Sequence, residues 1–297
     1  MMPSRLHEPD SRSAIGLLVL SSVLWGSAFV SVKIGLAYVN AYNLAFLRLA
    51  LGASILVPLL LLRKKFQFSM MRQRSVWILG FLNALGFLLQ YIGMLSTTAA
   101  KTALLVDLNV LIVAVLSWWM FQESFGKGKQ LGVFMGAVGA LMITTNGDLS
   151  NLTSGQLFGD ALVFSAGLAW ALFIVMHKRM LIQKEQNTIE LSAVVMVATA
   201  LFLLPVSVLV GGLSSSVISV EGWELIAYTA VACTVMPYVM WIVALKAVTA
   251  TVAGVVGLLE MVTAMVMSSL LIGESYSNIT IIGALLILFA LFAVAES

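Results

Sequence analysis

Long apolar segments constrain the fold of this chain more than any other feature. A helix needs about 17–25 mostly apolar residues to cross the hydrocarbon core of a bilayer. Ten segments follow this pattern: 14–32, 41–62, 76–95, 102–121, 131–145, 158–176, 191–210, 226–245, 250–272 and 279–294. The stretches between them are too short for a separate domain. The sequence therefore predicts an all-α polytopic membrane protein with ten transmembrane helices.

The composition agrees with this prediction. The chain has 297 residues, of which 61% are hydrophobic and only 10% are charged, whereas a soluble domain is about 25% charged. The first segment follows Arg5 and Arg12 and resembles a signal peptide. Because the repeat described below pairs it with an internal segment, we expect it to remain in the mature protein.

Lys and Arg are distributed unevenly between the two sets of loops. Thirteen of the 16 lie in the N-terminal tail or in the loops that follow segments 2, 4, 6 and 8, only Lys33 and Lys101 lie in the opposite loops, and Arg48 lies within a segment. Loops rich in Lys and Arg stay in the cytoplasm. We therefore expect both termini to be cytoplasmic, the loops 146–157 and 211–222 to be external, and the protein to lie in the plasma membrane.

The second half of the chain repeats the first. One set of residues matches another at a constant offset of 151: Thr98, Ala99, Leu108, Val115, Ser117, Glu123, Ser124 and Gly132 match Thr249, Ala250, Leu259, Val266, Ser268, Glu274, Ser275 and Gly283. Trp25 and Lys33 match Trp170 and Lys178 at an offset of 145, and Pro58 matches Pro205 at 147.

The repeat predicts a cytoplasmic tail 1–13, a first five-helix repeat 14–146, an external linker 147–157 and a second five-helix repeat 158–297. Five is an odd number, so the second repeat must be inverted relative to the first. Inverted repeats suit alternating access, because the two ends of the pathway are built from equivalent parts.

Two acidic residues, Asp107 and Glu260, lie inside matching segments, and Asn109 falls opposite Glu260 in the repeat. A carboxylate near the bilayer centre costs a few kcal/mol and usually marks a functional site. Glu260 could bind a substrate ammonium or a competing proton, or it could be a structural carboxyl. Arg48 could form a buried pair with Asp107, or it could receive a substrate carboxylate through its planar guanidinium.

Aromatic and amide side chains form stripes on two segments that match at an offset of 151. The stripes consist of Asn83, Phe87, Gln90 and Tyr91, and of Thr234, Pro237, Tyr238 and Trp241. Amides facing lipid are costly, so a cavity is expected at Asn83 and Gln90. The aromatic side chains either bind substrate or pack in the core.

Three further features bear on gating and packing. Gly86 matches Pro237, and this pair predicts two weakened helices that bend during gating. Trp25 and Trp170 lie in the middle of matched segments, where they either wall the cavity or pack between helices. Gly132 and Gly136 predict close helix packing, with a homodimer contact as one alternative.

The chain resembles the drug/metabolite transporter superfamily, and within it the EamA family of ten-helix transporters. The resemblance rests on SSVLWGSAFVSVKIGL, AFLRLALGA, YIGMLSTTAAKTALL, WMFQESFGKGKQLGVFMGAVG and LLIGESYSNITIIGALLIL, in this order. It implies a membrane transporter, frequently an exporter of amino acids or related metabolites, with a central cavity. The chain departs from the family pattern at Asn109 and Met261, where proline and a kink are common.

The sequence favours a secondary transporter that works by alternating access over an enzyme, a receptor or a structural protein. No phosphate-binding GxxxxGK[ST] loop and no HExxH or GxSxG motif is present in the sequence. With Cys233 as the one cysteine and two histidines, we expect no metal and no cofactor. The expected partners are a small-molecule substrate and the lipid bilayer, with protons as a candidate coupling ion, and no nucleic acid. An exporter of drugs or lipophilic cations is the main alternative to an amino-acid exporter. The sequence does not distinguish proton-coupled transport from facilitated diffusion.

Overall fold

The structure is a computed structural model that describes residues 11–63, 66, 68–121, 126–148, 155–184, 188–213, 218–245, 247–248 and 250–295. Every regular element in these ranges is helical. The first half contains α1 Ser11–Gly35, α2 Ala41–Leu62, α3 Arg74–Met94, α4 Ala99–Asp107, α5 Asn109–Phe121 and α6 Lys127–Thr145. The second half contains α7 Gly155–Lys184, α8 Thr188–Leu209, α9 Val220–Ala230, α10 Met236–Ala244, α11 Ala250–Gly257, α12 Leu259–Ile272 and α13 Asn278–Ala295.

The apolar helices follow the predicted segments closely. Within the described residues, seven helical stretches are long and apolar enough to cross a membrane, and Leu259–Ile272 and Asn278–Ala293 are shorter apolar helices. The all-helical membrane fold is therefore confirmed. The full count of ten spans and the cytoplasmic position of the termini stay predictions.

Three predicted segments are less regular than expected. Segment 102–121 is interrupted at Leu108, and segment 250–272 at Leu258, each time by a single turn residue between two helical pieces. The third, segment 226–245, contains a π-helix, Val231–Val235, between α9 and α10. The first two interruptions lie next to the acids, since Asp107 ends α4 and Glu260 lies in the first turn of α12.

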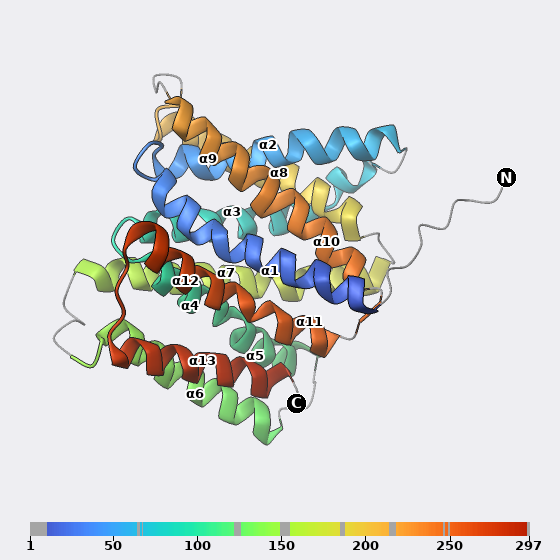
Figure 1. Ribbon diagram of the computed structural model, residues 1–297. Helices are drawn as coiled ribbons and strands as arrows, with labels where there is room; N and C mark the ends of the chain where they lie inside the picture. Colours follow the sequence, from blue (N-terminus) through green and yellow to red (C-terminus); the bar gives the residue numbers. More distant parts are fainter. Residues whose placement is uncertain are drawn as a thin grey trace.

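The two halves exchange their first helices. α1 packs against α10 and α12 of the second half, and α7 packs against α3, α4 and α5 of the first half. α2 packs against α8 and α6 against α13, so corresponding helices of the two halves also meet. Figure 1 shows α2 at one edge of the molecule and α6 with α13 at the other, with α1, α7 and α12 between them.

The molecule has two ends, which lie at the left and right of Figure 1. We call the right end, where the chain termini lie, the terminal end. The left end carries the loops between α1 and α2 and between α12 and α13, and we call it the distal end.

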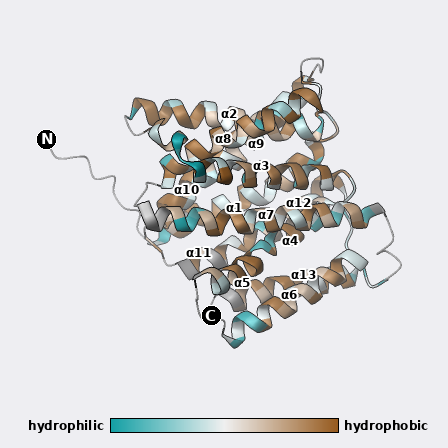
Figure 2. Cartoon of the chain, turned by 180° about the vertical axis from the view of Figure 1, so that it is seen from behind, coloured by the Kyte–Doolittle hydropathy of each residue, from teal (hydrophilic) through white to brown (hydrophobic). Residues whose placement is uncertain are grey.

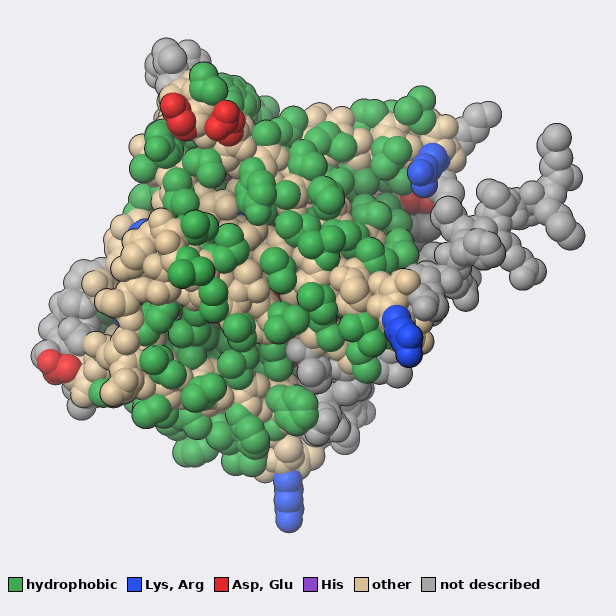
Figure 3. Space-filling model, viewed as in Figure 1, with side chains coloured by type: hydrophobic (Ala, Val, Ile, Leu, Met, Phe, Trp, Pro, Cys, Tyr) green, Lys and Arg blue, Asp and Glu red, His purple; other side chains and the backbone are tan. Residues whose placement is uncertain are grey.

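The surface between these ends is apolar. Figure 2 shows hydrophobic residues along the helices, and in Figure 3 apolar side chains form a broad band with charged side chains near its borders. Large apolar side chains are exposed, among them Trp119 at 72%, Phe134 at 67% and Leu270 at 77%, which is unfavourable in water. A lipid bilayer covers such a surface without cost.

The close packing predicted for Gly132 and Gly136 is observed, because both glycines are buried within the chain. The alternative of a homodimer contact stays a prediction. A Cβ at Gly136 would collide with the side chain of Leu111 in α5. In the same helix, a Cβ at Gly139 would lie 2.7 Å from the carbonyl oxygen of Gly283 in α13. The small residues of α6 therefore serve close packing against α5 and α13, as glycines in membrane helices commonly do.

Candidate functional site

Asp107 and Glu260 lie in the interior, where the two halves meet. Both side chains are half-buried, and the helices that carry them, α4 and α12, pack against each other. Among the described residues, neither carboxylate accepts a hydrogen bond or forms an ion pair with another side chain. A carboxylate inside a membrane protein is costly unless it faces a polar cavity or a partner, so the acid pair is a candidate binding site.

Small residues bring the first helix of each half against the acid-bearing helix of the other. A Cβ at Gly26 in α1 would lie 2.7 Å from the Cβ of Thr263 in α12, one turn after Glu260. A Cβ at Gly167 in α7 would lie 3.1 Å from the carbonyl oxygen of Val106, the neighbour of Asp107. The acid-bearing helices are thus in close contact with the other half, so relative motion of the halves would change the surroundings of both acids.

The guanidinium of Arg48 is held by protein groups. Its Nε donates to Thr234 Oγ1 at 2.8 Å, one terminal nitrogen donates to the Tyr91 hydroxyl at 2.8 Å, and the other donates to the Cys233 carbonyl at 2.9 Å. Its carbon lies 5.3 Å above the centre of the Phe87 ring, a cation–π distance. Arg48 is 6% exposed and Tyr91 is fully buried.

The pair of Arg48 with Asp107 that the sequence offered as one alternative is not observed. The ion pair recorded between described side chains is that of Lys101 with Asp160. Arg48 instead connects α2 of the first half to the region before α10 of the second half. Tyr91, expected at the substrate, serves as a partner of this arginine.

Proline explains why the Cys233 carbonyl is available to Arg48. In a regular helix this oxygen would accept a hydrogen bond from the amide of residue 237, which is Pro237 and has no N–H. The preceding turn is a π-helix, in which Thr234 Oγ1 donates to the carbonyl of Thr229, five residues earlier. Pro237 thus leaves a carbonyl free to accept a hydrogen bond from a buried cation. The sequence analysis predicted only that Pro237 bends its helix.

Gly86, predicted to weaken its helix, lies within an uninterrupted α3. A Cβ there would lie 2.8 Å from the indole ring of Trp170 in α7. The glycine therefore makes room for a tryptophan of the other half. A gating role for Gly86 stays a prediction.

Aromatic side chains surround the interior on both sides. Trp25 of α1 lies against Trp241 of α10, with ring centres 5.1 Å apart. Trp170 lies edge-on to Phe87 at 5.3 Å and donates from its indole nitrogen to Asn83 Oδ1 at 3.1 Å. All five side chains are half-buried.

Of the other predicted site residues, Asn83 and Tyr238 have polar partners, and Gln90 is buried. The Asn83 amide donates to Thr199 Oγ1 at 3.1 Å, the Tyr238 hydroxyl contacts Ser192 Oγ, and Gln90 is buried at 6% exposure. Thr199 and Ser192, both on α8, were missed by the sequence analysis. Hydroxyl groups on apolar helices are too common for their spacing to identify them.

The comparison with known proteins agrees with this geometry. The model of the EamA-like transporter family matches residues 12–145 and again residues 157–295, once in each half. The chain belongs to the EamA-like transporter family. It is therefore a transporter and a multi-pass membrane protein.

Similar proteins cover most of the chain. An "Uncharacterized transporter" of Archaeoglobus fulgidus is 28% identical over 232 residues, which are 77% of this chain and 78% of the relative. The "Uncharacterized transporter YyaM" of Bacillus subtilis is 26% identical over 277 residues, 92% of this chain and 90% of the relative. A solved structure with 17% identity has a TM-score of 0.69 and covers 95% of this chain and 97% of its own, which shows a shared fold.

Proposed function

We propose that this EamA-like transporter is a secondary transporter that exports small molecules carrying a protonated amine from the cytoplasm across the plasma membrane, with Asp107 and Glu260 as the binding groups. The observation that carries the proposal is the acid pair, half-buried and without a hydrogen-bonding partner in the described part of the chain. A substrate ammonium supplies the missing charge. Trp25, Trp241, Phe87 and Trp170 offer faces that attract a cation.

The reciprocal packing of the halves supports alternating access. α1 meets the acid-bearing α12, and α7 meets the acid-bearing α4. If the halves are inverted repeats that rock about the acid pair, the two ends open in turn without moving the site itself. The Lys- and Arg-poor distal end would face the outside and the terminal end the cytoplasm.

The hydrogen bonds that Arg48 already makes within the protein favour an amine over an amino acid as the substrate. An amino acid needs an anion site as well as a cation site, and Arg48 already donates three hydrogen bonds to Thr234, Tyr91 and Cys233. Breaking such buried contacts costs about 1–3 kcal/mol for each group left unsatisfied. An amino acid is the second candidate, because the planar guanidinium of Arg48 suits a substrate carboxylate.

A matched pair of substrates tests this proposal. Uptake of radiolabelled phenethylamine and of phenylalanine, which differ by one carboxylate, would be compared in proteoliposomes, with tetraphenylphosphonium as a lipophilic cation. We expect flux of phenethylamine that Glu260→Gln abolishes and that Glu224→Gln, an exposed acid in the first part of α9, leaves unchanged.

Each alternative result has a defined meaning. Flux of phenylalanine alone would contradict the amine proposal and would indicate that Arg48 binds the substrate carboxylate. Flux of tetraphenylphosphonium but not phenethylamine would favour a drug exporter. An imposed pH gradient that accelerates flux of the wild type would add protons as the coupling ion.

A further inference from the structure

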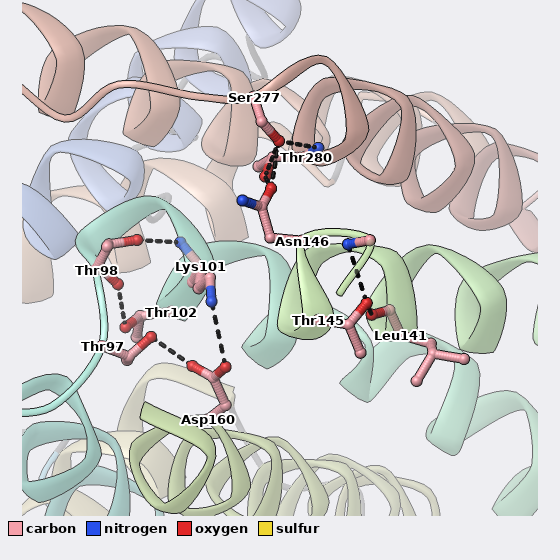
Figure 4. A network of polar contacts seen from close by, with 11 residues as sticks. Thr97, Thr98, Lys101, Thr102, Leu141, Thr145, Asn146, Asp160, Ser277 and Thr280 are labelled. Atoms are coloured by element: carbon pink, nitrogen blue, oxygen red, sulfur yellow. Dashed lines mark hydrogen bonds and ion pairs between the residues drawn. The ribbon is translucent and has the colours of Figure 1, made fainter. Parts of the chain in front are cut away.

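At the distal end, the corner between α3 and α4 is tied to the second half by polar contacts. Asp160 of α7 accepts a hydrogen bond from the Thr97 hydroxyl, and its other oxygen lies 3.5 Å from Lys101 Nζ (Figure 4). Asp160 and Thr97 are 3% and 5% exposed. A buried carboxylate with two partners from the opposite half holds the two halves together at this end.

A second carboxylate holds the beginning of α4. Glu274, after α12, accepts from the backbone N–H groups of Ala99 at 2.7 Å and Ala100 at 3.2 Å. These amides lie in the first turn of α4, where they lack helical partners and favour a negative charge. Tyr276 donates to Glu274 at 3.3 Å, and partial burial raises the pKa of Tyr276 to about 12, so its hydroxyl stays protonated and able to donate.

We call Thr97, Lys101, Asp160 and Glu274 the polar latch. Beside it lies a polar cavity of about 250 Å³, lined among others by Thr98, Lys101 and Tyr276. Lys33 stiffens the corner from within the first half, because its Nζ donates to the carbonyls of Met94 at 2.6 Å and Thr97 at 2.7 Å.

The repeat predicts no equivalent latch at the terminal end. At the offset of 151, Thr97 corresponds to Val248 and Lys101 to Val252, and at the offset of 145, Asp160 corresponds to Ile15. Three latch positions therefore become apolar. Glu274 corresponds to Glu123, which lies outside the described residues.

The described residues of the terminal end include an apolar cluster between the halves. Ala14 and Leu18 of α1 form a buried cluster with Ala244 and Ala253, and Val248 packs against it. Apolar packing has no directional requirement, whereas the latch depends on hydrogen bonds with defined geometry. Among the described residues, directional polar contacts therefore join the halves at the distal end, and an apolar cluster joins them at the terminal end.

We propose that the polar latch is a one-sided gate that keeps the distal end closed in the substrate-free protein, so that the acid pair loads from the terminal end. The inference rests on the proposed transport by alternating access and adds a direction to it. Opening the distal end requires that Asp160 and Glu274 exchange their partners for water. Removing the latch favours the open distal end without changing the acid pair.

Distance measurements test this gate without any substrate. Spin labels would be placed on cysteines at Leu95, exposed in the α3–α4 corner, and at Gln156, exposed at the start of α7, in a Cys233→Ala background in nanodiscs. Electron–electron double resonance then reports the separation of the two halves at the distal end.

For Asp160→Asn combined with Thr97→Val, we expect the population at long distances to rise about threefold to tenfold, as the loss of one or two hydrogen bonds implies. Thr97→Val, which installs the residue of the other repeat, should give a smaller rise and keeps the protein testable if the double variant does not fold. Glu224→Gln, which removes a charge elsewhere, should leave the distances unchanged.

Unchanged distances in the folded Thr97→Val variant and in the folded double variant would overturn the proposal that the latch is a gate. This result is distinguishable from failure of the proposed function. A protein that carries amines but shows no distance change lacks the gate, whereas a protein that changes distance but carries no tested compound has a gate and another substrate.

Discussion

The interior of the molecule contains a buried arginine and a pair of acids, and the surroundings of the arginine are opposite to those of the acids. Arg48 is 6% exposed and donates to three protein acceptors, whereas Asp107 and Glu260 are half-buried and accept nothing in the described part of the chain. Both kinds of charge are costly in a membrane. The difference shows that depth in the bilayer alone does not identify a binding residue; the partners of the charge do.

Under the proposed function, the comparison separates a charge that joins the halves from the charges that bind the substrate. Arg48 fixes α2 to the region before α10 by using a carbonyl that Pro237 leaves free. The acid pair has no such contacts, so its electrostatic cost is compensated when a cation arrives. Four predictions sharpen or break this contrast.

The largest effect is expected for Arg48→Leu. The substitution leaves the buried Tyr91 hydroxyl and Cys233 carbonyl without their donor, at a cost of roughly 2–5 kcal/mol in the free energy of unfolding. The melting temperature in detergent and the folded yield should both fall, while Arg63→Leu, at the exposed end of α2, should change little. Normal stability with lost transport would instead place Arg48 in the substrate site.

Glu260→Gln should have the opposite effects, with reduced transport and unreduced stability. The amide keeps the shape of the side chain but removes the charge that binds the substrate ammonium, so amine uptake should fall about tenfold or more. The melting temperature should stay equal or rise, because an unpaired charge is removed from the interior. A large loss of stability would show that Glu260 is a structural carboxyl.

Asp107→Asn should reduce uptake less than Glu260→Gln if Glu260 makes the closer contact with the ammonium. Because the two carboxylates act on one ligand, the double variant should lose less than the product of the single losses, as coupled sites do. A double-mutant cycle on the uptake rate measures this. Strictly multiplicative losses would mean that the acids act at separate sites.

The smallest effect is expected for Trp241→Leu. Loss of one cation–π contact should raise the half-saturation concentration for amine uptake about two- to fivefold. Trp119→Leu is a matched control, since Trp119 is 72% exposed on the lipid-facing surface. Equal effects of the two substitutions would assign Trp241 to packing against Trp25 rather than to the substrate.

Much of the fold follows from the sequence, because apolar length decides where helices lie in a membrane. Predicted segment 41–62 coincides with α2, Ala41–Leu62. The repeat also identified the segments that carry Asp107 and Glu260. The interruptions at Leu108 and Leu258 were not predicted, because neither position contains proline.

The partners within the site were harder to predict. Arg48 binds a backbone carbonyl, Cys233 O, and every residue has a carbonyl, so no side-chain pattern indicates it. Asp160 and Thr97 belong to different halves and meet only after α7 packs on α3. Contacts of this kind depend on tertiary packing, which local periodicity does not determine.

The most direct test of the central claim is chemical labelling of the acid pair. Dicyclohexylcarbodiimide modifies carboxyl groups in apolar surroundings, and mass spectrometry of the digested protein locates the adduct. The account predicts modification at Glu260 or Asp107 that phenethylamine prevents and phenylalanine prevents less well. Modification that neither compound affects, in protein that transports phenethylamine, would contradict a binding site at the acid pair.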